Sequence, residues 1–185
     1  MLKRLAAVIT IGLGSFVSIG SVQAAPIALD QWYAFQWSGT APADAIACTG
    51  GCGLLTGSID APADSPWTID GPVVFKVTDA FISTDQFEIF DNLVSVGTTS
   101  LFSTGGSCGP SVDDCYADSD FSSGLFNLGA GSHSITITTV AGSSTAGAAY
   151  FRAESGSVPA PVPLALMGLG LAALGYQRRK QIKAT

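Results

Sequence analysis

The sequence predicts an all-β protein, and specifically a single antiparallel β-sandwich of the jelly-roll kind. Short segments of alternating apolar and polar residues recur between clusters of Gly, Ser, Thr and Asp. About seven to nine such segments fit the central part of the chain, which is the spacing expected of a sandwich. A closed barrel would give the same alternation and remains open. The chain has no repeat of fixed period, which argues against a solenoid or a propeller.

The first predicted strand, at 31–37, is rich in aromatic residues. It places Tyr33, Phe35 and Trp37 on one face and Trp32 on the other, since successive side chains of a strand point to opposite sides. One of these two faces is expected to be exposed. The other predicted strands lie at 73–77, 86–90, 93–96, 101–102, 134–138 and 148–154, with weaker segments at 54–59 and 68–69.

Two long loops are predicted, at 45–53 and 104–124, and each contains two cysteines. An even number of cysteines in an exported chain indicates disulfides. Three pairings are open, and the local one is favoured because it closes one small loop at each site. It joins Cys48 to Cys52 and Cys108 to Cys115. A zinc site is the weaker alternative, because the spacing of the second pair is poor and His133 is the one histidine.

The N-terminal segment, 1–24, has the organisation of a secretory signal peptide with a signal helix. Lys3 and Arg4 precede an apolar run at 5–19, and Val22 and Ala24 occupy the −3 and −1 positions of a cleavage site. The alternative is an N-terminal membrane anchor, for which the apolar run is short. We therefore expect an exported protein whose body begins at residue 25.

The predicted body, 25–157, is strongly acidic. It contains all 14 acidic residues and only two basic ones, Lys76 and Arg152, which gives a net charge of −12. Such a body should repel phosphate backbones and anionic lipid, so no nucleic-acid partner is expected. It would attract cations.

One acidic cluster lies in the second predicted loop. Oxygen-rich clusters on loops suit Ca²⁺, which takes six to eight oxygen ligands, although the spacing is not that of an EF-hand. Calcium is the one cofactor that the sequence suggests, and otherwise none is expected. The candidate ligands are Asp113, Asp114, Asp118 and Asp120. A second set of possible calcium ligands surrounds the predicted strand at 86–90: Asp79, Asp85 and Asp91. The favoured interpretation is instead that Asp91 with Asn92 forms a turn after that strand.

No catalytic motif is recognisable. His133 precedes a strand without an accompanying nucleophile or triad motif, so no catalytic residue is assigned and a non-enzymatic protein is expected. Aromatic rings that remain exposed on a sheet stack on sugars. The candidates for such a platform are Trp32, Tyr33, Phe35, Trp37 and Trp67, and the alternative is that these rings pack in the core and on the sheet.

The C-terminal segment, 158–185, has three parts. A proline-rich stretch with Val158, Pro159 and Pro161 precedes an apolar run at 163–176. The run is predicted to form a short transmembrane helix, since a relaxed span needs about 20 residues. A basic stop follows and would stay on the cytoplasmic side. It consists of Arg178, Arg179 and Lys180.

This three-part order resembles the PEP-CTERM sorting signal of Gram-negative bacteria, with Ala160 where the usual motif has glutamate. The resemblance implies that an exosortase-like transpeptidase of the inner membrane recognises the tail. The body would be tethered there transiently and then delivered to the cell surface or the extracellular polysaccharide matrix. The segments 85–100, 131–137 and 148–152 also resemble parts of the β-rich ectodomains that carry such tails.

The expected function is therefore that of an exported, non-enzymatic protein of the cell surface or extracellular matrix, associated with exopolysaccharide in a biofilm. A carbohydrate- or calcium-binding lectin-like module is the alternative from a different class. A secreted hydrolase is the third hypothesis, and no motif supports it.

Overall fold

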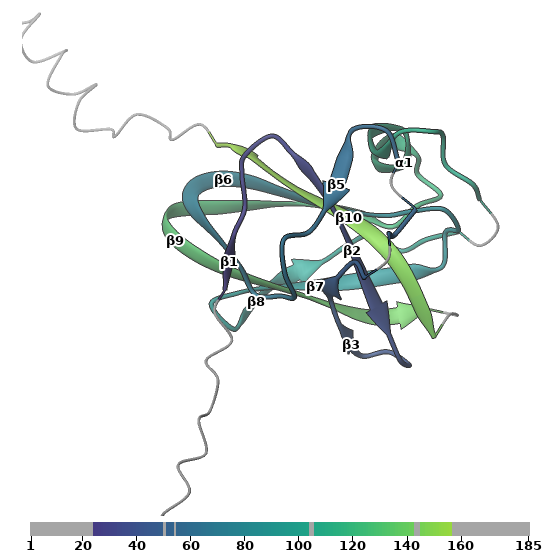
Figure 1. The fold of residues 1–185 in the computed structure, drawn as a ribbon, viewed down its shortest axis with the longest axis horizontal. Coiled ribbons are helices and arrows are strands. Elements are labelled where there is room, and N and C mark those ends of the chain that lie inside the picture. The colour runs from purple at the N-terminus through teal and green to yellow at the C-terminus, as the bar shows by residue number, and fades with distance from the viewer. Residues whose placement is uncertain (1–23, 50, 54, 104–105, 143–144, 157–185) are drawn as a thin grey trace, which may run out of the picture.

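The computed structural model describes residues 24–49, 51–53, 55–103, 106–142 and 145–156 (Figure 1). The predicted signal helix, apart from Ala24, and the whole predicted sorting segment with its short helix lie outside these residues. Within them the chain is mostly antiparallel β-sheet with one short helix, which confirms the all-β class. None of the described helices has the length and apolar character needed to cross a membrane.

Ten strands and one helix follow one another in the described part of the chain. They are β1 (Ala25–Pro26), β2 (Trp32–Ser38), β3 (Ala43–Asp44), β4 (Ile46–Ala47), β5 (Ser58–Asp60), β6 (Trp67–Asp79), β7 (Asp85–Asp91), β8 (Val94–Thr98), α1 (Val112–Ala117), β9 (Ser123–Gly142) and β10 (Ala146–Ser155). The main path through the sheet is β4-β2-β10-β6-β9-β7-β8. Three short strands join beside it, with β1 parallel to β6, β5 parallel to β2 and β3 antiparallel to β9.

Most predicted strands lie inside observed ones, but the segment at 101–102 is not a strand. The N–H of Thr99 bonds to the carbonyl of Phe87, and that of Ser100 bonds to Ser123, after which the chain leaves the sheet. The preceding strand, β8, lies at the edge of the sheet. Its apolar residues Val94 and Val96 are both exposed.

The two longest strands, β6 and β9, run along each other and bend together. Their register shifts between Gly71 and Val73, which is the signature of a bulge and increases the local twist. A Cβ on Gly71 would lie 2.0 Å from the carbonyl oxygen of Gly129 and 2.6 Å from Nε2 of His133. Only glycine therefore allows this close approach. The sequence split β6 into two segments because Pro72 interrupts the alternation.

The bent sheet curls on itself, so that strands far apart in the strand order pack against one another around one hydrophobic core. Phe35 and Trp37 of β2 contact Phe87 of β7, with ring centroids 5.6 and 5.3 Å apart. Trp67 of β6 lies 4.4 Å from the ring of Phe151 of β10. All five side chains are buried. Burial of this apolar surface is the main stabilising contribution to the fold.

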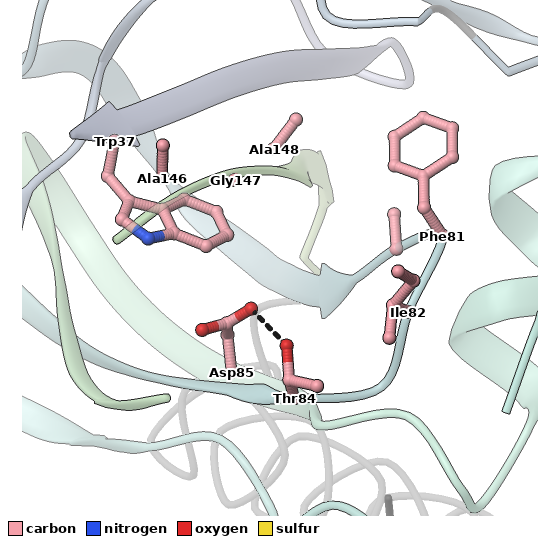
Figure 2. Close-up of a pocket in the computed structure, with 9 residues that line it drawn as sticks. Trp37, Phe81, Ile82, Thr84, Asp85, Ala146, Gly147 and Ala148 are labelled. Carbon is pink, nitrogen blue, oxygen red and sulfur yellow. Dashed lines mark hydrogen bonds between the residues drawn. The ribbon is translucent and has the colours of Figure 1, made fainter. Parts of the chain in front are cut away.

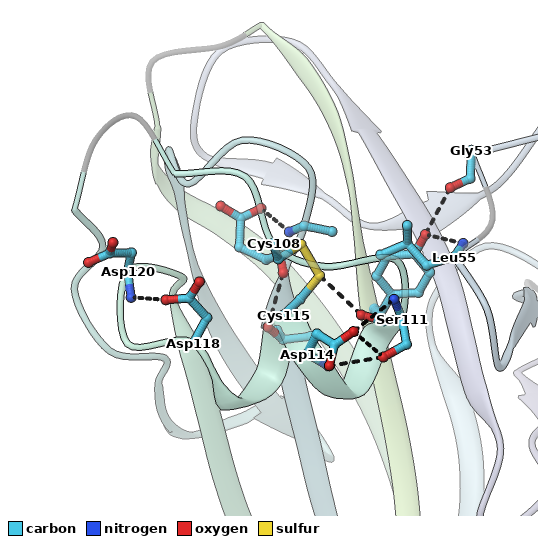
Figure 3. Close-up of a disulfide and its surroundings, with 12 residues drawn as sticks. Gly53, Leu55, Cys108, Ser111, Asp114, Cys115, Asp118 and Asp120 are labelled. Atoms are coloured by element: carbon cyan, nitrogen blue, oxygen red, sulfur yellow. Dashed lines mark hydrogen bonds between the residues drawn. A yellow bond between two sulfur atoms is a disulfide. The ribbon is translucent and has the colours of Figure 1, made fainter.

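A second, smaller apolar cluster covers the opposite face of β2 and β10. Trp32 and Tyr150 pack there with Val112 and Cys115 of α1. The sequence predicted a loop at this position, but Ser111 caps a helix through a capping box with Asp114. Figure 3 shows how the disulfide to Cys108 fixes this helix beside the sheet.

Both basic residues of the body are engaged near α1. Lys76 donates to Oε1 of Glu154 at 2.8 Å, and Arg152 pairs with the same carboxylate. The guanidinium of Arg152 also lies 5.0 Å from the ring centroid of Trp32, a cation–π distance. Glu154 therefore pairs with both basic residues of the body, and Arg152 also lies 3.5 Å from Oδ1 of Asp113.

Candidate functional site

An open pocket lies where the end of β2, the start of β10 and the 80–84 loop meet (Figure 2). Its volume is about 240 Å³, room for about eight waters at ~30 Å³ each. Most of the wall is apolar and comes from Ala80, Phe81, Ile82 and the small residues at the start of β10. The polar groups are the indole of Trp37, the hydroxyl of Thr84 and the carboxylate of Asp85.

The indole of Trp37 reaches the pocket because the residue opposite it on β10 is a glycine. Trp37 pairs in register with Gly147, and a Cβ on Gly147 would lie 2.3 Å from Cζ2 of the indole. The indole is 2% exposed, and within the described part of the chain its Nε1–H has no hydrogen-bond acceptor. In Figure 2 the nitrogen edge of the ring is turned toward the side of the pocket where Asp85 and Thr84 lie.

The loop that forms the opposite wall is organised around the buried carboxylate of Asp79. Its Oδ1 accepts the backbone N–H of Ala80 at 2.8 Å. Its Oδ2 accepts the N–H of Thr84 at 3.0 Å and that of Asp85 at 3.1 Å. Ser83 ties the outer side of the loop down, since its hydroxyl accepts the N–H of Gly106 at 3.0 Å. Hydrogen bonds on both sides of the loop therefore set its shape.

Burial changes the acidity of Asp79. Removal of the carboxyl from water raises its pKa from 3.8 to about 7, although the three backbone N–H groups act in the opposite direction. The negative charge of Asp85 contributes to the same rise. The loop wall therefore contains an acid that changes its charge near neutral pH.

Phe81, in the same loop, has a backbone conformation that is unusual for a residue with a side chain. Its φ is 64°, in the left-handed region. The ring lies against Gly53, where a Cβ would be 3.2 Å from Cζ of the phenyl group, and near Tyr150. Strain of this kind persists only where surrounding contacts hold it, and it is common at ligand-binding loops.

Asp85 closes the floor of the pocket. It is 3% exposed, and its Oδ2 accepts the Thr84 hydroxyl at 2.7 Å. Its Oδ1 lies against Gly142, where a Cβ would approach to 2.0 Å. The pocket therefore combines a hydrogen-bond donor, a carboxylate acceptor and apolar walls. Asp79 ends β6 and Asp85 begins β7, so these two aspartates bound the loop that forms this wall of the pocket.

Three of the four aspartates considered for calcium accept hydrogen bonds within the protein through their carboxylates. Oδ1 of Asp113 accepts the indole N–H of Trp32 at 3.0 Å, and Asp114 caps the first turn of α1. Asp118 accepts the backbone N–H of Asp120 at 2.9 Å (Figure 3). No three of these aspartates bring carboxylate oxygens within 4.8 Å of one another.

Among the described residues, the one group of three potential ligands that does converge is Cys48, Cys52 and Asp60. Its two sulfurs are joined in a disulfide, and a disulfide has no thiolate to offer a metal. This position is therefore a poor metal site.

The five aromatic rings considered as a platform for sugars belong to the core instead, which is the other interpretation of this pattern. All five candidate rings are buried, because the core covers one face of β2 and α1 with its loop covers the other. Neither face of β2 is left exposed. Trp37 still contributes to the pocket, but it does so through the nitrogen edge of its ring.

His133 is held inside the sheet. Nδ1 lies 2.7 Å from Oδ2 of Asp91, and Nε2 lies 2.9 Å from the carbonyl oxygen of Gly129. Burial alone lowers the pKa of the imidazole, but the bonds to Asp91 and Gly129 outweigh it and raise the pKa above 6.5. Asp91 lies 42 residues away in the sequence, so no local pattern signals this pair.

The cysteines pair locally, Cys48 with Cys52 and Cys108 with Cys115, as the sequence favoured. The predicted sorting motif and basic stop lie outside the described residues. Comparison of the chain with protein-family models, curated proteins and solved structures finds no match.

Proposed function

We propose that the chain is an exported, non-enzymatic protein of a Gram-negative cell surface or extracellular matrix, sorted through its C-terminal tail. The observation that carries the proposal is the pairing of a signal-type N-terminus with the three-part tail at 158–185. An exosortase-like transpeptidase of the inner membrane would recognise the tail. The membrane-tethered precursor would then pass to the surface and its exopolysaccharide.

The disulfides support this setting. Both lie in the loop-rich region around α1, where they restrict segments with few sheet hydrogen bonds. Disulfides persist in oxidising compartments and are rare in the bacterial cytosol. The acidic body, at −12, suits a protein that must stay soluble outside the cell.

We further propose that the body is a β-sandwich of the jelly-roll kind. Support comes from the antiparallel pairing, from the bend at the bulge between β6 and β9, and from the contact of β2 with β7 across the core. Sheets that face each other across an apolar interior are the defining feature of this architecture.

The sorting proposal is tested in cells that encode an exosortase. The full chain is followed by fractionation with an antibody against the folded body, and the C-terminus of the recovered protein is identified by mass spectrometry. We expect the body outside the inner membrane, without the residues beyond the proline-rich motif. A matched variant carries Gln at Arg178, Arg179 and Lys180, and it should accumulate as the precursor. Retention of the unchanged chain at the inner membrane, with Thr185 present, would contradict sorting.

A further inference from the structure

The pocket beside β2 contains a polar group that has no hydrogen-bond partner among the described residues. Trp37 is almost fully buried, and the part of the chain that the structure describes offers no acceptor to its Nε1–H. A buried donor without an acceptor carries a cost comparable to a lost hydrogen bond, so natural proteins rarely keep one without a purpose. Trp37 is one of the residues that line the pocket, and Figure 2 shows the nitrogen edge of its ring turned toward the side where Asp85 and Thr84 lie.

The same pocket presents an acceptor. The Asp85 carboxylate lines its floor, and each carboxylate oxygen can accept more than one hydrogen bond. Thr84 already donates its hydroxyl to Oδ2 and thereby fixes the orientation of the carboxylate. Donor and acceptor thus face one space whose remaining walls are apolar.

This combination selects among ligand classes. An anion would accept from the indole but would meet the carboxylate of Asp85 and a body of charge −12. A cation would pair with the carboxylate but would leave the indole N–H of Trp37 without an acceptor. A neutral hydroxyl both accepts and donates, so it can accept from the indole and donate a further hydrogen bond to the carboxylate. Its carbon skeleton would pack on Ile82 and on the small residues of β10.

We propose that this pocket binds a neutral polyhydroxylated ligand, one saccharide unit, through Nε1 of Trp37 and the carboxylate of Asp85. A volume of about 240 Å³ accommodates one sugar ring. The free sugar and the end of a polysaccharide share this chemistry. The proposal concerns the folded body alone, so the binding experiment tests it independently of the sorting of the tail.

The wall opposite Trp37 is pre-organised for such a ligand. Asp79 accepts three N–H groups of the 80–84 loop and its neighbour, and Ser83 holds the loop from the other side. Phe81 keeps its left-handed backbone under these constraints. A wall that is fixed before binding reduces the entropy cost of binding.

The test follows the indole N–H signals of the ¹⁵N-labelled full chain, exported from a Gram-negative host so that both disulfides form. The chain has three tryptophans, and the Trp37 signal is identified by its loss in Trp37→Phe. Glucose, galactose, mannose and N-acetylglucosamine are titrated separately, with dextran as the polymer. We expect a saturable shift of the Trp37 signal with at least one neutral saccharide. A response to dextran identifies a chain end as the source, and a response to monosaccharide alone identifies the free sugar.

Calorimetry with the responding sugar then compares three variants. Trp37→Phe and Asp85→Asn should each weaken binding by about tenfold, because each removes one hydrogen bond to the ligand. Trp32→Phe is the matched control, since that indole N–H is already paired with Asp113 on the other face of β2. It should leave the affinity unchanged.

Three results would overturn the proposal. The first is the absence of any saturable Trp37 shift with the neutral saccharides. The second is a shift with choline or with acetate in place of the sugars, which would assign the pocket to a charged ligand. The third is a loss of affinity in Trp32→Phe as large as that in Trp37→Phe, which would trace the effect to the fold.

Discussion

Asp79 gives the most quantitative prediction, because its protonation is linked to folding. Its pKa rises from 3.8 in the unfolded reference to about 7 in the folded protein. Between these values the folded state keeps a proton that the unfolded state has released, so stability falls as the pH rises. A difference of about 3 pKa units corresponds to about 4 kcal/mol, fully present below pH 4 and lost by about pH 7 to 8.

The perturbation is Asp79→Asn, which keeps the shape of the protonated acid and removes the titration. Urea unfolding of both proteins at several values between pH 4 and pH 8, with disulfides intact, gives the free energy of unfolding of each. The advantage of the wild type over the variant should shrink by about 4 kcal/mol across this range. The variant also loses hydrogen bonds to the 80–84 loop, but that loss shifts its curve without changing its slope.

Asp30→Asn is the control, because that carboxylate is exposed and its left-handed backbone tolerates asparagine. It shows what an aspartate-to-asparagine change at an exposed position does to the unfolding curve. If the difference between wild type and Asp79→Asn stays constant within about 1 kcal/mol, burial does not raise the pKa of Asp79 and the account of the loop is wrong.

Two further predictions concern His133 and Gly147. The folded pKa of His133 lies above 6.5, so its bond to Asp91 stabilises the fold at low pH and this contribution is lost as the pH rises through that pKa. His133→Gln should therefore cost about 1–2 kcal/mol at pH 6 and less at pH 9 by urea unfolding, and an equal cost at both would contradict the charged pair. Gly147→Ala should cost about 1–3 kcal/mol in thermal unfolding, because the new methyl group would overlap the Trp37 indole. Gly129→Ala, where a Cβ meets nothing within 4 Å, should change stability by less than about 0.5 kcal/mol, and equal effects would refute the packing argument.

The sequence predicted the strands where alternation was unbroken. The segment at 73–77 and the segment at 134–138 each put apolar side chains into the core, as period-two patterning requires. The same rule failed where the chain departs from regular pairing. Pro72 and the glycines at 129–131 suggested breaks, yet β6 and β9 continue through them around a bulge.

The site was less predictable than the fold. The sequence identified Trp37 as a candidate for stacking on a sugar through its ring face, whereas the structure places the nitrogen edge of the ring beside the pocket. The alternation of residues cannot show that both faces of β2 are covered. The 80–84 loop takes its shape from the tertiary position of Asp79, and the pocket exists only because Gly147 lies in register with Trp37. The register of Gly147 with Trp37 joins positions about 110 residues apart, and a pairing at that distance leaves no local signal.

The edge strand β8 has a further consequence for behaviour at high concentration. It presents unpaired backbone groups together with exposed Val94 and Val96, a combination that in many proteins leads to pairing between copies. The body carries −12, so two copies approaching edge to edge repel each other. Salt screens this repulsion beyond about 10 Å at 0.1 M. Colloidal stability of the protein should therefore depend on ionic strength, with acid and divalent ions promoting assembly through this edge.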